Sequence, residues 1–240
     1  MIAVYRLSDQ SPSFEFFFWL VYVVAKGATE IVIDPSNPKT SKMSVDDINT
    51  YLESVVIPGA AFAGVPIKIK AGANGIVCSA QEMLPWAKAG GQFKRLVSVK
   101  PPGKAPYTVT IRNHKRAKSR NSNVVAWRTF AEEIGATILE DYADQRLHIH
   151  ERMALYAGAK MNFTVCNGPA GLLALSPYPQ RMFVPNQSSC NAQLKFGVAL
   201  NTERWPWMLP TQKLVWKPDT IENLRETMDE LKATLDLDFD

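Results

Sequence analysis

The sequence predicts an α/β protein made of two small Rossmann-like βαβ domains that face each other across a cleft. Short β-forming runs alternate with helix-forming segments from the first residues onward, and this alternation stops at a proline-rich segment near residue 101 and then starts again. The length of 240 residues suits one large domain or two small ones. A hydrophobic content of 46% is ordinary for a chain that buries a core.

The first unit, residues 1–100, is expected to form a parallel sheet with helices on both faces. The expected strands are 2–5, 30–34, 66–70, 76–78 and 96–99. The expected helices are 14–26, 44–55 and 80–89, and a capping box at Ser44 to Asp47 opens the second of them. A polar loop that contains Asp9 connects the first strand to the first helix.

The most apolar segment of the chain runs from residue 14 to residue 24 and contains one charged residue, Glu15. A bilayer span needs about 20 apolar residues, so we expect a buried helix rather than a membrane span. The segment before it carries Asp9 as well as Arg6, and no small-x-small cleavage site follows, which argues against a signal peptide. We therefore expect a soluble cytoplasmic protein.

The three cysteines are Cys78, Cys166 and Cys190, and no two of them form a CxxC pair. This spacing supports neither a disulfide framework nor a zinc site, and a reducing compartment fits it best. His148 and His150 have no carboxylate-rich metal pattern around them. We expect no metal site.

The segment 101–106 is the expected linker, because prolines and a glycine dominate it. The second unit, 107–218, is expected to contain strands at 107–111, 136–139, 163–166 and 181–184, with helices at 123–134, at 147–159 and from 171. The tail, 219–240, holds eight acidic and two basic residues and is expected to form an amphipathic helix that packs back on the first unit. Its acidic charge offsets a basic loop near residue 115 and keeps the net charge at +4.

That basic loop lies between an expected strand and an expected helix, and five Lys or Arg residues fall between 112 and 120. Ligands of open α/β sheets bind at the carboxyl ends of the strands, where basic side chains and a helix N-terminus favour phosphate. We expect a diphosphate site here; its candidate residues are Arg112, Lys115, Arg116, Arg120, Asn121 and Ser122, with His114 as a secondary candidate. The alternatives are a solvated basic loop and a nucleic-acid contact.

A second loop of small residues follows the expected strand at 163–166. It contains Asn167, Gly168, Pro169, Ala170 and Gly171. Small residues let a ligand approach the backbone, so this loop is a candidate for binding the nucleotide or sugar part of a donor. The segment matches neither GxGxxG nor a P-loop, and an ordinary βα turn is the alternative.

Asp9 is the candidate catalytic base, because it follows the first strand and would lie at the cleft if the two units face each other. The alternative is that Asp9 only caps a turn or the first helix. Asp34, at the end of the second expected strand, is a weaker candidate for the same role.

The segment from Val109 to Asn123, with Trp127 and Phe130, resembles the opening of the nucleotide-binding domain of certain bacterial and viral glycosyltransferases. The run 151–159, followed by Asn167 to Leu172, is similar to the segment that closes the donor site in GT-B-type enzymes, including heptosyltransferase-like and fucosyltransferase-like members. The resemblance covers about residues 107–185. The Gly-Asp pair of the heptosyltransferase-like members is absent at Asp9, and the chain is short for a GT-B enzyme.

The resemblance implies a metal-independent glycosyltransferase without a cofactor, which moves a sugar from a nucleotide-diphosphate sugar to a hydroxyl of a glycan, lipid-linked or other acceptor. An Asp base implies inversion of configuration. Two alternatives stay open. One is a nucleic-acid-binding α/β protein, which the concentration of charge in one loop disfavours. The other is a catalytically inactive relative that binds nucleotide or sugar.

Overall fold

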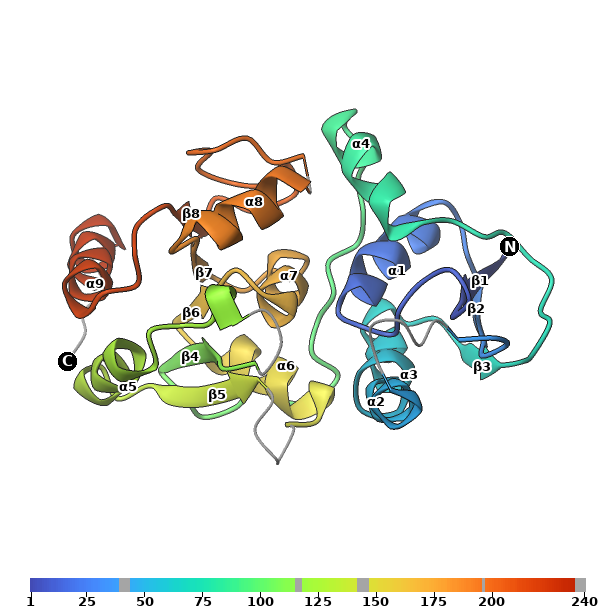
Figure 1. The fold of residues 1–240 in the computed structure, drawn as a ribbon, viewed down its shortest axis with the longest axis horizontal. Helices are drawn as coiled ribbons and strands as arrows, with labels where there is room; N and C mark the ends of the chain where they lie inside the picture. The colour runs from blue at the N-terminus through green and yellow to red at the C-terminus, as the bar shows by residue number, and fades with distance from the viewer. Residues whose placement is uncertain (39–43, 115–117, 142–146, 196, 236–240) are drawn as a thin grey trace.

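The computed structural model describes residues 1–38, 44–114, 118–141, 147–195 and 197–235. In this part of the chain the protein is α/β, and its strands form two separate parallel sheets of three and five strands (Figure 1). The general α/β prediction is therefore confirmed. No helix in the described ranges is long and apolar enough to cross a membrane.

The smaller sheet consists of β1 (Ile2–Arg6), β2 (Glu30–Asp34) and β3 (Ile67–Ile69), all parallel and in this order. On the other side of β1, Ile76 forms a single parallel bridge with Ala3, so the expected strand at 76–78 is reduced to one bridge. Helices do not cover both faces of this sheet as expected, because Val4 and Val32 pack against Ala73, which lies in a loop.

The larger sheet has the strand order β5-β4-β6-β7-β8. Its strands are β4 (Tyr107–Arg112), β5 (Thr137–Asp141), β6 (Met161–Val165), β7 (Gln180–Phe183) and β8 (Gln212–Val215), and all of them pair in parallel. The chain leaves β4 toward one edge and returns to β6 on the other side. The carboxyl ends of β4 and β6 therefore form a topological switch point, where open α/β sheets bind ligands.

Helices cover both faces of the larger sheet. The helices of this unit are α5 (Val124–Glu133), α6 (Ile149–Gly158), α7 (Gly168–Ala174), α8 (Gln187–Lys195) and α9 (Ile221–Leu235). Side chains of α5 and α9 share one hydrophobic cluster with β4 and β6, and those of α6 and α7 belong to the other. The described part of the tail does not return to the first unit as expected, because α9 lies beside α5 on the larger sheet (Figure 1).

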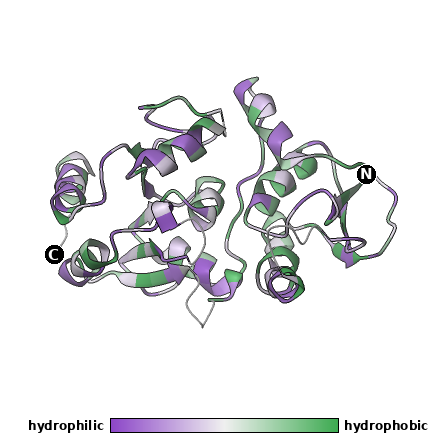
Figure 2. Ribbon diagram, viewed as in Figure 1, coloured by the Kyte–Doolittle hydropathy of each residue, from purple (hydrophilic) through white to green (hydrophobic). Residues whose placement is uncertain are grey.

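The helix α1 (Glu15–Ala25) lies between the two sheets (Figure 1). Figure 2 shows that hydrophobic residues dominate it, and seven of its eleven residues are buried. One hydrophobic cluster joins α1 and the smaller sheet to α6 and α7 of the second unit. Close approach to α7 depends on glycine, because a Cβ added at Gly168 or Gly171 would lie 2.8 or 2.9 Å from the rings of Phe14 or Phe18. The predicted buried helix is thus confirmed, and it joins the two units.

The remaining helices of the first unit are α2 (Val45–Tyr51), α3 (Ile57–Gly59) and α4 (Met83–Lys88), with a π-helical segment at 52–56 and 3-10 turns at 60–63 and 80–82. Ser44 is the N-cap of α2, because its hydroxyl accepts a hydrogen bond of 3.1 Å from the N–H of Asp47. The expected helix at 44–55 is therefore present, with a change of helical type inside it.

The expected strand at 96–99 is wrong. The N–H of Leu96 donates to the carbonyl of Leu175, and that of Ser98 donates to the hydroxyl of Tyr178, so this segment bonds to loops of the second unit rather than to a sheet. Arg95 adds hydrogen bonds of 3.2 and 2.6 Å to the carbonyls of Ala174 and Trp207.

Candidate functional site

A pocket of about 220 Å³ lies where the carboxyl ends of β4 and β6 meet the start of α1. The second unit contributes the end of β4, the loop before α5 and the loop that follows β6. The first unit contributes the first turn of α1 and Tyr51. The residues that carry its chemistry are Glu15, Arg112, Arg120, Cys166, Asn167 and Gln193. The structure thus brings Arg112 and Arg120 of the basic loop and the small-residue loop to one pocket at the switch point.

Arg112 is the last residue of β4 and is only 7% exposed. Its backbone N–H donates to the hydroxyl of Ser122 at 2.9 Å, which fixes the start of the loop. Its side-chain Nε is buried and has no hydrogen-bond partner. No described carboxylate lies within 4.0 Å of its guanidinium. A buried cation without a partner is costly, so this geometry suits a site that an anion completes.

Arg120 ends a short 3-10 turn, Lys118–Arg120, on the opposite side of the same loop. Its Nη2 donates to the carbonyl of Cys166 at 3.0 Å, which ties the basic loop to the end of β6. Its Nε is also buried without a partner. The pocket therefore contains two guanidinium groups with unused donors, which match the planar, paired oxygens of phosphate and carboxylate.

The neighbouring polar residues of the loop hold its shape. The side chain of Asn121 accepts from the N–H of His114 at 3.0 Å and donates to its carbonyl at 3.1 Å. Ser122 is bonded to Arg112 through both its hydroxyl and its N–H. None of these three neighbours lines the pocket, and we infer that they position Arg112 and Arg120. Lys115 and Arg116 lie outside the described residues.

The loop after β6 offers fewer free backbone donors than expected. Asn167 is the N-cap of α7, and its side-chain oxygen accepts from the N–H of Ala170 at 3.0 Å. The N–H of Gly171 donates to the Asn167 carbonyl, and Pro169 has no N–H. Asn167, Gly168 and Gly171 line the pocket, whereas Pro169 and Ala170 are buried in the core. The side chains of the two arginines are therefore the main donors there.

Cys166 lies at the back of the pocket and is buried. Burial raises the pKa of its thiol, while the charge of Arg120 and a hydrogen bond from Gln193 act in the opposite direction. The Gln193 side chain is itself oriented by Trp205, whose indole N–H donates to its oxygen at 2.7 Å. A buried neutral thiol behaves as a small apolar group, so Cys166 serves packing here rather than nucleophilic chemistry.

The two expected carboxylates do not line this pocket. Asp9 is exposed in the turn after β1, where its N–H donates to the carbonyl of Arg6. Asp34 is buried and accepts hydrogen bonds from the N–H groups of Ser36 and Gly72 at 3.0 and 3.2 Å. Hydrogen bonds from the hydroxyl and the N–H of Ser36 lower the pKa of Asp34, so this carboxylate stays ionised and holds a turn.

The carboxylate that does line the pocket is Glu15, an exposed residue in the first turn of α1. In the sequence, Glu15 stands out only as the one charge in an apolar run. That isolation is itself the missed signal, because a single acid at the start of an otherwise buried helix marks the point where the helix meets solvent. Phe14, Phe18 and Trp205 add aromatic walls to the pocket.

Among the described residues, no group of three or more His, Cys, Asp or Glu side chains is arranged to hold a metal ion. Comparisons of the chain with protein-family models, with curated proteins and with solved structures find no match. The pocket itself holds Arg112 and Arg120, each with a buried Nε that has no partner, together with the exposed carboxylate of Glu15 and the aromatic side chains of Phe14, Phe18 and Trp205.

Proposed function

We propose that this protein is a glycosyltransferase of GT-B-like, two-domain architecture, which binds the diphosphate of a nucleotide-diphosphate sugar at Arg112 and Arg120. One observation carries the proposal: both arginines line one pocket at the switch point of the larger sheet, and both have a buried Nε without a partner. An anionic ligand would satisfy both groups at once, since each charge-assisted hydrogen bond contributes about 1.5–3 kcal/mol.

The position of these cations suits the chemistry of sugar transfer. When the bond between the anomeric carbon and the diphosphate oxygen breaks, negative charge grows on the leaving group. Guanidinium groups that are already in place stabilise that charge without reorganising, which is the largest contribution in many enzymes. Two arginines supply this stabilisation through side chains of the protein, and the proposal therefore includes no metal.

The acceptor must lose a proton as its oxygen attacks the anomeric carbon. We propose Glu15 as the base in place of Asp9, because Glu15 lines the pocket and Asp9 does not. The Glu15 carboxylate takes the hydroxyl proton, the acceptor oxygen bonds to the anomeric carbon, and the diphosphate leaves with the electron pair of the broken bond. Attack from the face opposite the leaving group inverts the configuration.

A nucleic-acid-binding role is less well supported, because Arg112 is 7% exposed and contributes to a pocket rather than to a surface. A polymer backbone is recognised by exposed Lys and Arg side chains, and its binding weakens steeply with salt. The other alternative is a catalytically inactive relative, which binds nucleotide or sugar. Turnover measurements distinguish it from an enzyme.

The test combines binding with turnover. Calorimetry with a panel of nucleoside diphosphates and nucleotide sugars is expected to find at least one ligand whose affinity falls in Arg120→Gln and is unchanged in Lys118→Gln, an exposed residue of the same loop outside the pocket. Release of nucleoside diphosphate is then measured for Glu15→Gln and Asp9→Asn. Loss of turnover in Asp9→Asn alone would show the base assignment to be wrong, and a failure of every nucleotide to bind would refute the proposal as a whole.

A further inference from the structure

A second and larger pocket, of about 780 Å³, lies along the edge strand β8 of the larger sheet. Its walls come from the amino-terminal ends of β6 and β7, from the length of β8 with Trp216 and Lys217 after it, and from the second half of α9. The first pocket lies at the carboxyl ends of β4 and β6. The two pockets have no lining residue in common. A cavity of several hundred Å³ is the size that small-molecule ligands occupy.

Two cations lie side by side on the floor of this pocket. Arg181 and Lys213 are paired in register on the adjacent strands β7 and β8, and both line the pocket. Neighbouring strands are about 4.8 Å apart, and like charges directly opposite each other on one sheet face repel. Burial lowers the pKa of the Arg181 guanidinium, and the charges of Glu230 and Glu203 act in the opposite direction.

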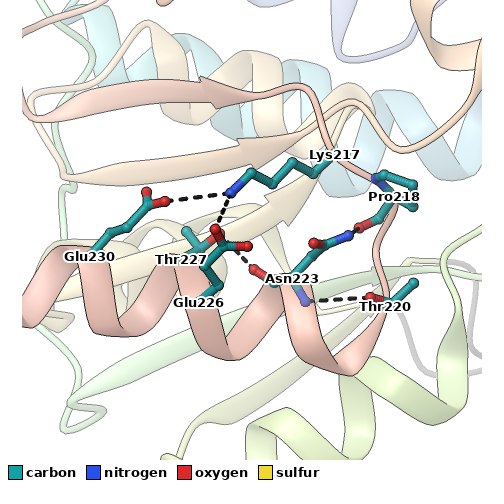
Figure 3. A network of polar contacts seen from close by, with 7 residues as sticks. All are labelled: Lys217, Pro218, Thr220, Asn223, Glu226, Thr227 and Glu230. Carbon is teal, nitrogen blue, oxygen red and sulfur yellow. Dashed lines mark hydrogen bonds and ion pairs between the residues drawn. The ribbon is translucent and has the colours of Figure 1, made fainter.

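The acidic residues of the pocket are paired with other cations. Glu230 lies 3.4 Å from the ammonium of Lys217, which also pairs with Glu226 at 2.9 Å (Figure 3). Glu203 lies 3.6 Å from Arg204. In the described ranges, neither Arg181 nor Lys213 has a carboxylate within 4.0 Å. Four cationic residues, Lys160, Arg181, Lys213 and Lys217, line the pocket against two carboxylates, so the lining carries excess positive charge.

Apolar side chains surround these two charges. Pro179 and Trp216 are half-buried and Pro210 is exposed, and these three line the pocket together with the buried Met161, Val215 and Leu231. A free inorganic anion would leave these walls in contact with water, and a purely apolar ligand would leave the two cations uncompensated. The combination fits a molecule with an anionic head and an apolar body.

We propose that this pocket is a binding site for an amphipathic small-molecule anion. Its carboxylate or phosphate head lies between Arg181 and Lys213, and its apolar body packs against Pro179 and Trp216. This site is separate from the proposed donor site, so either proposal can fail without the other.

The first test uses ligands that share an apolar body. Decanoate, decyl phosphate and decanol are titrated into the full chain by calorimetry, below the concentrations at which they form micelles. We expect saturable one-site binding of at least one anion, with decanol weaker by about tenfold or more because it carries no charge. The ratio of the two anion affinities identifies the preferred head group.

Two variants locate the site. Lys213 is exposed, so Lys213→Glu is expected to fold and to weaken anion binding by about tenfold or more. Thr234 lines the pocket from the exposed side of α9, and Thr234→Trp is expected to abolish binding by filling the space. Lys70→Glu, an exposed residue outside both pockets, is the charge-matched control. Equal binding of decanol and decanoate, no saturable binding, or wild-type affinity in both variants would overturn the proposal.

Discussion

Replacing Arg112 by methionine is expected to make the protein more stable and its anion binding weaker. The substitution keeps most of the apolar stem and removes the charge. An unpaired cation that is 7% exposed is held in the fold at a cost, because burial takes away water and the described residues supply no carboxylate in return. The same charge is what an anionic ligand would bind. One change therefore shifts the two properties in opposite directions.

The size of both effects follows from the geometry. Buried charges without a partner cost several kcal/mol, and the open pocket reduces this, so we expect a gain of about 2 kcal/mol in the free energy of unfolding. For a chain of this length that corresponds to a rise in Tm of about 4–8 °C. Loss of one charge-assisted hydrogen bond is expected to weaken pyrophosphate binding by about 10- to 150-fold.

Urea unfolding with and without pyrophosphate measures both quantities. At 100 times its Kd, pyrophosphate stabilises the wild type by about 2.7 kcal/mol; if Kd rises 100-fold, the same concentration stabilises Arg112→Met by about 0.4 kcal/mol. Arg120→Met is the informative comparison, because it also loses the hydrogen bond to the Cys166 carbonyl and should gain little or no stability. Lys118→Met is the exposed control. The reasoning is refuted if Arg112→Met is less stable than the wild type and is stabilised by pyrophosphate to the same extent.

Three further predictions concern packing and titration. Gly158→Ala should lower the free energy of unfolding by about 1–3 kcal/mol in urea titrations, because the new Cβ would lie 1.8 Å from the carbonyl oxygen of Gly103; a stability equal to wild type would contradict this packing. The stability that Asp34 contributes should be complete above its ordinary pKa of about 3.9 and disappear as the pH falls through its lowered pKa. Asp34→Asn should flatten that part of the acid-unfolding curve, and an unchanged curve would exclude the assignment. Cys166 should be the slowest thiol to react with iodoacetamide at pH 7.5, as mass spectrometry of the peptides would show, because burial raises its pKa and blocks access; rapid labelling would rule out a buried thiol.

The parallel strands of the two units were largely predictable from the sequence, because central strands of a covered sheet are continuous apolar or β-branched runs. β4 and β6 are buried at every position, and most of their residues are apolar or β-branched. β8 was missed because it is a four-residue edge strand in which polar residues come first. The segment 96–99 has the composition of a strand, but hydrogen bonds to Leu175 and Tyr178 hold it along the second unit.

Part of the candidate site was also predictable from the sequence, because it depends on local structure. Arg112 and Arg120 follow the rule that ligands bind at the carboxyl ends of parallel strands, which is a local property of strand, loop and helix. The roles of Asn121 and Ser122 depend on their hydrogen-bond partners. Both side chains accept hydrogen bonds from backbone N–H groups of the loop, those of His114 and Arg112. Glu15 could not be assigned to the site, because its place in the same pocket as Arg112 depends on how one unit packs on the other.

The contact between α1 and α7 also bears on the size of ligand that the first pocket accepts. Phe14 and Phe18 form part of its wall, and they lie directly on Gly168 and Gly171, with no side chain between ring and backbone. A single methyl group at either glycine would push a ring away and change the width of the pocket by a few tenths of an ångström. Small substitutions at these two glycines would therefore alter selectivity by ligand size while leaving every charged group unchanged.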